Sequence, residues 1–219
     1  ALMNDQSRPA PQGVRSAVET VAEASFALLR RHGIDKIFGN PGSTELPMFV
    51  NLPGDFTYVL GLQESVAVGM ADAHAQITGN AAFVNLHSAA GLGHAMGNLY
   101  TAMKNRTPLI VTTGQQTRAL LPGEPFLGNE APETMPGPCV KWAIQPARAE
   151  DVPRALEQAY WRAMQAPRGI ADPMIRFLDH AVEVLQHQPV DRSRHGPIVA
   201  DETDQQLRDV VAHGLLRHR

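Results

Sequence analysis

The sequence predicts an α/β fold: a doubly wound parallel sheet with helices on both faces. Two observations predict it. Short apolar runs alternate along the chain with segments of helical periodicity, which is the pattern of repeated βαβ units. The apolar runs are also nearly continuous, as expected of parallel strands that are buried on both faces.

The first predicted helix spans residues 14–32, where apolar side chains recur at helical spacing. Its last turn is basic, which suits the helix dipole, and Gly33 is placed to end it. A strand over 34–38 follows. A tight loop comes next, in which Ser43 or Thr44 is expected to cap a short helix.

The later elements are predicted to alternate in the same way. They are a strand over 56–62, a helix over 65–78, a strand over 81–86, a helix over 91–104, strands over 109–113 and 140–144, and a helix over 151–165. A long proline-rich loop over about 114–138 interrupts the series, and such loops are usually functional or disordered.

We divide the chain into three parts on these patterns. Residues 1–13 form a loose leader, residues 14–182 an α/β domain, and residues 183–219 a linker with the incomplete start of a middle domain. The last part begins with a polar, proline-interrupted stretch and includes a possible helix over 201–216.

The composition narrows the function classes. A net charge of −3 argues against a nucleic-acid binder, whose footprint is a basic patch. No apolar run approaches the length of a membrane span, and the N-terminal residues lack the apolar region of a secretory signal. The single cysteine, Cys139, excludes an intrachain disulfide and favours the cytoplasm.

Polar side chains follow the predicted strands, where an open α/β sheet binds its ligands. Ser43, Glu64 and His87 each come after a different strand. Each has a simpler alternative, since Ser43 is suited to a helix cap, Glu64 to the first turn of a helix and His87 to the interior. Only their convergence on one rim of the sheet makes them candidates for a site.

The sequence lacks the motifs of several other enzyme classes. The glycines at 91 and 93 lack the third glycine of a dinucleotide fingerprint, because Met96 stands in its place. The chain has no Gly-x-Ser-x-Gly elbow, no Walker-type Gly-Lys-Ser/Thr and no zinc-type His-x-x-x-His pair. We therefore predict no metal ligands on this chain.

Several segments resemble the thiamine-diphosphate-dependent 2-oxo acid decarboxylases, and most closely their benzoylformate decarboxylase branch. These segments are 38–47 (FGNPGSTELP), 62–72 (LQESVAVGMAD), 85–91 (NLHSAAG), 108–111 (PLIV) and 114–118 (GQQTR). The resemblance covers about 27–169 and implies a pyrimidine-binding α/β domain. Relatives that make acetolactate usually lack a histidine at position 87, so His87 favours the decarboxylase branch.

The resemblance implies a role for each site residue. Glu64 would hydrogen-bond the pyrimidine ring of thiamine diphosphate, and a partly desolvated carboxyl group that exchanges a proton with that ring favours activation of the cofactor. His87 would move protons on substrate-derived species. Ser43 would bind the substrate carboxylate. The wall near the cofactor would be formed by Asn40, Pro41 and Gly42, and the substrate pocket would be lined by Phe126 and Leu127.

The chain also departs from the family. The family's diphosphate-binding domain carries a Gly-Asp-Gly motif whose residues bind Mg²⁺ and the diphosphate, and this motif is absent here. The family's closing strand should follow Gly169, but the segment 170–180 matches it poorly.

We therefore predict the pyrimidine-binding half of an enzyme that decarboxylates a benzoylformate-like 2-oxo acid to an aldehyde and CO₂, inactive alone. A second copy or a separate diphosphate-binding domain would complete the site, so that a homo-oligomer is expected. The alternatives are a subunit of a split thiamine-diphosphate enzyme and a non-catalytic binding module that kept the fold.

Overall fold

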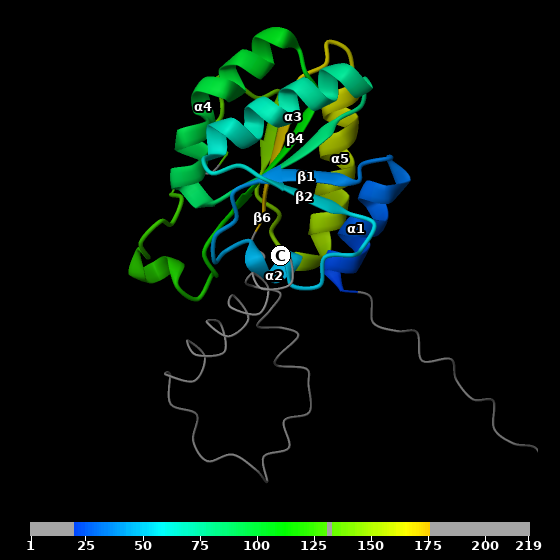
Figure 1. Ribbon diagram of the computed structural model, residues 1–219. Helices are drawn as coiled ribbons and strands as arrows, with labels where there is room; N and C mark the ends of the chain where they lie inside the picture. The colour runs from blue at the N-terminus through cyan, green and yellow to red at the C-terminus, as the bar shows by residue number, and fades with distance from the viewer. Residues whose placement is uncertain (1–19, 131–132, 176–219) are drawn as a thin grey trace, which may run out of the picture.

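Six strands form one parallel sheet, with helices packed against both of its faces (Figure 1). The computed structural model describes residues 20–130 and 133–175. The strand order is β2-β1-β3-β4-β6-β5, and every neighbouring pair is parallel. The predicted α/β class is therefore confirmed.

The chain enters the sheet through α1 (Val21–Arg31) and β1 (Lys36–Gly39). Thr20 and Glu23 form a reciprocal capping box at the start of α1, which satisfies backbone N–H groups that the helix leaves free. At the other end Gly33 has φ 68°, a left-handed conformation that favours glycine. The expected start of this helix at residue 14 lies outside the described residues.

The short helix α2 (Leu46–Phe49) is not capped as predicted. Glu45 occupies its N-cap position, and no side chain caps the helix. The Thr44 hydroxyl donates to the carboxylate of Glu45 and also contacts His87 Nδ1. Ser43 is exposed. The prediction was wrong because the neighbouring Glu45 carboxylate and the distant His87 ring engage the Thr44 hydroxyl in place of the helix backbone.

The remaining elements agree with the predicted order, with ends that differ by a few residues. They are β2 (Thr57–Leu60), α3 (Glu64–Thr78), β3 (Ala82–Leu86), α4 (Ser88–Asn105), β4 (Leu109–Gly114), η1 (Leu121–Gly123), β5 (Trp142–Ile144), η2 (Ala149–Asp151), α5 (Val152–Met164) and β6 (Ile170–Ile175). The main difference is α4, which begins at Ser88 and not at residue 91. None of the helices in the described part of the chain combines the length and apolar content that a membrane crossing requires.

The core consists of two clusters, one on each face of the sheet. Alternate residues of β3 divide between them: Phe83 packs with α1 and α5, whereas Ala82 and Val84 pack with α3 and α4. Alanines dominate the buried side of α3, and they allow this helix to lie close to the sheet and to α4. The two layers hold the carboxyl ends of the strands at a common edge.

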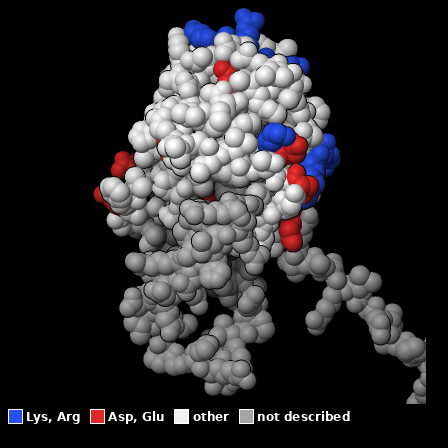
Figure 2. Space-filling model, viewed as in Figure 1, with Lys and Arg blue, Asp and Glu red and all other residues white. Residues whose placement is uncertain are grey.

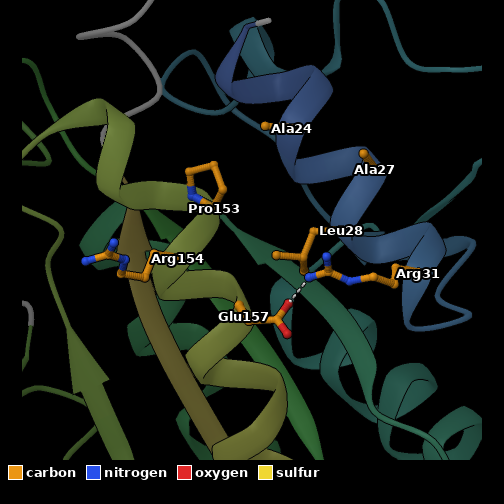
Figure 3. A pocket seen from close by; sticks show the side chains of 7 residues that line it. All are labelled: Ala24, Ala27, Leu28, Arg31, Pro153, Arg154 and Glu157. Carbon is orange, nitrogen blue, oxygen red and sulfur yellow. Dashed lines mark hydrogen bonds and ion pairs between the residues drawn. The ribbon is translucent and has the colours of Figure 1, made fainter.

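A shallow groove separates α1 from α5 on one face (Figure 3). Ala24 and Leu28 line it, and Arg31 crosses it to bind Glu157, with 2.6 Å between Nη2 and Oε2. His32 Nε2 lies 2.9 Å from the same oxygen. Partial burial opposes ionisation of Glu157, but the hydrogen bonds from His32, Trp161 and Arg31 outweigh it and lower its pKa to about 2. This carboxylate therefore ties the two helices together.

The strand β6 forms from the segment that matches the family poorly, and it carries two residues that suit an inner strand badly. Pro173 has no N–H to donate, and proline is rare between two strands. Asp172 is buried, and neither of its carboxylate oxygens has a hydrogen-bond partner among the described residues. Burial raises the pKa of Asp172 to about 8. This strand is the least well satisfied part of the described sheet.

We predict that Asp172→Val raises the free energy of unfolding at pH 7 by about 1–3 kcal/mol, the usual penalty for a buried polar group without a partner. The folded protein holds a proton on Asp172 that the unfolded chain releases above about pH 4. Stability should therefore decline as the pH rises from about 4 to about 8, and the variant should lose this component. Urea unfolding at several pH values would measure it.

Asp35→Asn is a suitable control, because Asp35 is exposed and pairs only with its neighbour Lys36 in the described structure. This variant should leave the pH dependence of the unfolding free energy nearly unchanged. A less stable Asp172→Val protein would contradict our account of β6.

Candidate active site

The candidate site lies at the carboxyl edge of the sheet, where β1 and β3 are neighbours. The chain leaves β1 toward β2 on one side and leaves β3 toward β4 on the other, so the two loops diverge at this point. Ligands of open α/β sheets bind at such a switch point. The loop after β1, the start of α3 and the start of α4 all meet here.

The loop after β1 joins the two ionisable groups that the sequence singled out. At one end, Asn40 Nδ2 donates to Glu64 Oε1 over 3.2 Å. At the other end, Gly42 lies so close to the His87 ring that a Cβ at position 42 would overlap it. The structure therefore brings Glu64, His87, Asn40 and Gly42 together at one edge, as the sequence predicted.

Glu64 is the first residue of α3 and is only 6% exposed. A helix N-terminus stabilises a carboxylate, so this position is favourable for it. A Cβ at Gly91 of α4 would lie 3.0 Å from Glu64 Cγ, so a larger residue there would push against the carboxyl group. Its second oxygen, Oε2, lies 3.2 Å from Nδ1 of His94. The carboxyl group is thus held from both sides.

His87 ends the turn from β3 into α4 and forms an ion pair with Glu45, whose Oε2 lies 2.8 Å from His87 Nδ1. This hydrogen bond is the main reason that the pKa of His87 is raised. Partial burial opposes the rise, and the negative charges of Glu45 and Glu64 add to it. The side chain is 23% exposed, so a protonated imidazole can be reached from solvent.

Glu45 is the residue that the sequence analysis missed. It is fully buried, and its carboxylate accepts from Gly42 N–H at 2.9 Å and from Ser88 N–H at 3.3 Å. At the end of β4, Gly114 leaves room for it, because a Cβ at Gly114 would collide with Oε1. The only signal in the sequence was an acidic residue within the conspicuous loop, and its partners outside that loop, His87 and Ser88, come from the turn after β3.

The turn that carries His87 has an unusual backbone. Ser88 has φ 52°, in the left-handed region that non-glycine residues seldom adopt. This conformation lets α4 begin directly after His87 and directs the Ser88 N–H at Glu45. Strain of this kind tends to be retained at functional sites.

The other predicted site residues are less closely engaged. Ser43 is exposed and Pro41 is half-buried, both in the loop after β1. Phe126 is 88% exposed, and Leu127 beside it has φ 65°. Phe126 therefore lines no closed pocket within the described residues. The described ranges also contain no group of His, Cys, Asp and Glu that could hold a metal ion.

An open parallel sheet with a buried carboxyl group and a paired histidine at its switch point defines a cofactor-binding α/β domain. Residues 19–135 match the model of the family described as thiamine pyrophosphate enzyme, N-terminal TPP binding domain. The chain therefore belongs to the thiamine pyrophosphate enzyme family.

Individual relatives agree with this assignment. The chain is 50% identical over 151 residues to benzoylformate decarboxylase of Pseudomonas aeruginosa, covering 69% of this chain and 29% of that protein. It is 30% identical over 150 residues to acetolactate synthase isozyme 3 large subunit of Escherichia coli, covering 68% and 26%. The crystal structure of benzoylformate decarboxylase from Polynucleobacter necessarius superposes with a TM-score of 0.73 at 43% identity, covering 83% and 33%. The chain spans about a third of the length of these relatives.

We predict that Glu45→Gln lowers the pKa of His87, because the hydrogen bond that chiefly raises it loses its charge while the opposing burial remains. Gly42 N–H donates to Oε2 and Ser88 N–H donates to Oε1, so the single amide oxygen can keep one of these two bonds. Circular dichroism should therefore show that the variant is folded before it is titrated. Titration of the His87 ring protons by NMR would measure the change.

Glu157→Gln provides the matched control, since Glu157 binds a different histidine, His32, on the opposite face of the sheet. This variant should leave the midpoint of the His87 titration unchanged. An unchanged His87 midpoint in Glu45→Gln would show that the carboxylate does not govern this histidine.

Proposed function

We propose that this chain supplies the pyrimidine-binding half of a thiamine-diphosphate-dependent enzyme that decarboxylates a benzoylformate-like 2-oxo acid to an aldehyde and CO₂. The observation that carries the proposal is the shared edge of Glu64 and His87, bridged by the loop from Asn40 to Glu45. The 50% identity to a benzoylformate decarboxylase supports the choice of substrate class.

The residues present fit the pyrimidine end of the cofactor. A ring nitrogen needs a carboxyl group that is largely desolvated yet open on one side, and Glu64 meets both conditions. It is buried, and only the exposed His94 ring covers its second oxygen. Two further hydroxyls near this edge, those of Ser88 and Thr113, are buried and have no partner among the described residues. The edge thus offers polar groups that a ligand could engage.

Bound thiamine diphosphate supplies the carbon nucleophile and the electron sink that decarboxylation requires. This chain's residues supply positioning and proton control. Glu64 holds a proton at the ring nitrogen, and Asn40 fixes the rotation of its carboxyl group through Oε1. His87, whose pKa is raised chiefly by its hydrogen bond to Glu45, delivers a proton to the substrate-derived carbon or oxygen. Glu45 itself is a positioning residue.

The proposed substrate contacts lie in the loop after β1 and in the proline-rich loop after β4. Ser43 is exposed at the tip of the loop after β1, where its hydroxyl is available to a carboxylate. Pro41 and Gly42 shape the wall beside it. Phe126 and Leu127 become pocket residues once another polypeptide surface covers them, and an apolar pair there suits an aromatic 2-oxo acid.

We propose that the rest of the site lies outside this chain. The chain spans about a third of its relatives, and the described residues contain no candidate ligands for Mg²⁺. We propose that the diphosphate and Mg²⁺ are held by a diphosphate-binding domain, in the same polypeptide or in another. The chain alone should bind the cofactor weakly and turn over no substrate.

The outer face of α3 and α4 is the surface that such a domain, or a second copy, would cover. Leu62 is 89% exposed and Ile77 is 86% exposed, and the only acidic residues of α3, Glu64 and Asp72, are both buried. Figure 2 shows this face as mainly uncharged, with the charged side chains gathered near its margins. An exposed apolar face of this kind marks an interaction surface.

Two alternatives stay open. A split-enzyme subunit would share every feature above and would find its diphosphate-binding partner on another polypeptide. A non-catalytic module would have kept the fold without the reaction, and it would show no turnover when combined with a diphosphate-binding domain. The buried free Cys139 accords with a cytoplasmic location for any of these.

A complementation assay tests the proposed function. The chain is mixed with a separately produced diphosphate-binding domain of a benzoylformate decarboxylase, thiamine diphosphate and Mg²⁺, and benzoylformate turnover is measured. We expect turnover only in the mixture, and Glu64→Gln should reduce it by about 10²–10⁴-fold because the amide cannot exchange a proton.

Glu150→Gln is the control, because Glu150 is an exposed carboxylate in η2. It should retain full turnover. Equal turnover by the wild-type and Glu64→Gln mixtures would exclude the assigned role of Glu64, and a folded mixture without turnover would favour the non-catalytic alternative.

We also predict that the chain self-associates through the α3–α4 face. Light scattering at roughly tens of micromolar should give a mass above that of one chain, corresponding to a Kd in the micromolar range. Ile77→Glu should shift the protein toward the monomer, because it places a charge in the apolar face. Val50→Glu, at an exposed apolar residue of the α2 end, should not. A monomer at all these concentrations would contradict the prediction.

A further inference from the structure

The residue roles proposed above do not account for one contact at the carboxyl edge of the sheet. Nδ1 of His94, on α4, lies 3.2 Å from Oε2 of Glu64. The two side chains differ sharply in exposure: that of His94 is 62% exposed, and that of Glu64 is 8% exposed. An exposed imidazole therefore touches a buried carboxyl group directly.

The other described neighbours of Glu64 offer no route for a proton between its carboxyl group and solvent. Its other oxygen is held by Asn40, an amide that can hydrogen-bond but cannot transfer a proton. Gly91 of α4 also faces the Glu64 side chain, but it has no side chain of its own. His87 acts on Glu64 only through its charge, and its own ring nitrogen is engaged by Glu45. Among the described residues, His94 is the titratable side chain with a hydrogen-bond path to Glu64.

We propose that His94 is a proton-relay residue that carries protons between solvent and Glu64. This inference rests on the proposed function, because Glu64 must gain and lose a proton to serve a pyrimidine ring. In the forward direction the Nδ1–H of a protonated His94 gives its proton to Oε2 of Glu64, which leaves a neutral imidazole and a neutral carboxyl group. The neutral ring still carries its proton at Nε2, so exchange with water first moves that proton to Nδ1. The freed Nε2 then takes a proton from hydronium in the solvent, which restores the protonated ring.

Imidazole suits this task for two reasons. Its ordinary pKa near neutrality lets it both take and release a proton at physiological pH. Its two ring nitrogens also allow one to face the carboxyl group while the other faces water. A residue with only one polar atom, at the same place, could position Glu64 but could not pass a proton through.

The first test uses the unloaded chain. The ring nitrogens of the histidines are followed by ¹⁵N NMR in the wild type and in Glu64→Gln. The signal of His94 Nδ1 should shift in the variant, whereas that of His74, which packs on Phe38, should stay in place. If the His94 signal is the same in both proteins, the contact does not exist in solution and the relay is excluded.

The second test uses the chain assembled with the diphosphate-binding domain and thiamine diphosphate. The exchange of the cofactor C2 proton for deuterium is measured in three proteins: the wild type, His94→Ala and His94→Asn. Both variants should slow the exchange about tenfold, less than the full contribution of an acid–base group because water can still reach the site slowly. Added imidazole should restore the rate in His94→Ala, where the missing ring leaves space.

The outcomes separate the relay from the proposed function. Wild-type exchange that Glu64→Gln abolishes but His94→Ala leaves unchanged would overturn the relay and leave the function standing. A normal rate in His94→Asn alone would mean that His94 only positions Glu64 and would also overturn the relay. A wild-type assembly without any exchange would overturn the proposed function, and the relay with it. Equal melting temperatures of the variants would exclude unfolding as the cause of slower exchange.

Discussion

The buried carboxylate of Glu45 organises this edge of the sheet. A charge without access to water must be neutralised by a partner and by hydrogen bonds, and Glu45 obtains both from two segments, its own loop and the turn after β3. It binds the backbone of its own loop at Gly42, the backbone of the α4 turn at Ser88 and the ring of His87. These bonds lock the loop after β1 against the turn after β3. Asn40, in the same loop, is thereby held beside Glu64.

The parallel sheet makes this convergence possible. Because β1 and β3 are paired in register, their carboxyl ends lie at the same edge, and residues that follow them are neighbours in space although they are far apart in sequence. Glycines at three positions keep the edge open for this packing, since Gly42, Gly91 and Gly114 each face a functional side chain at a distance that leaves no room for a Cβ. Their role is spatial, because they lie outside the left-handed region.

The two ends of the sheet differ in how well they are satisfied. At the β1–β3 edge nearly every buried charge is paired, and the helices α1 and α5 are further joined through Glu157. At the β6 end, Asp172 is buried without a partner and Pro173 interrupts the strand. The candidate site therefore lies at the end of the sheet where the buried carboxyl groups have partners. The strand β6, which matches the family poorly, lies beyond β4 from this site.

The sequence by itself determined the fold class and the order of most elements, and it predicted that Asn40, Gly42, Glu64 and His87 lie at one edge of the sheet. It could do so because buried parallel strands leave continuous apolar runs and because groups that end such strands share one edge. The sequence also predicted Ser43 or Thr44 as the cap of a short helix. That prediction could be corrected only when the partners of the Thr44 hydroxyl, Glu45 and His87, were known.

Tertiary structure alone decided the roles of Glu45 and His94 and the existence of β6. Glu45 is recognisable only from its partners in the turn after β3, and His94 only from its distance to Glu64. The strand β6 forms despite Asp172 and Pro173, because pairing with β4 and β5 on both sides outweighs local preference. Contacts between distant segments leave no periodic trace in the sequence, and therefore they can be read only once the chain is folded.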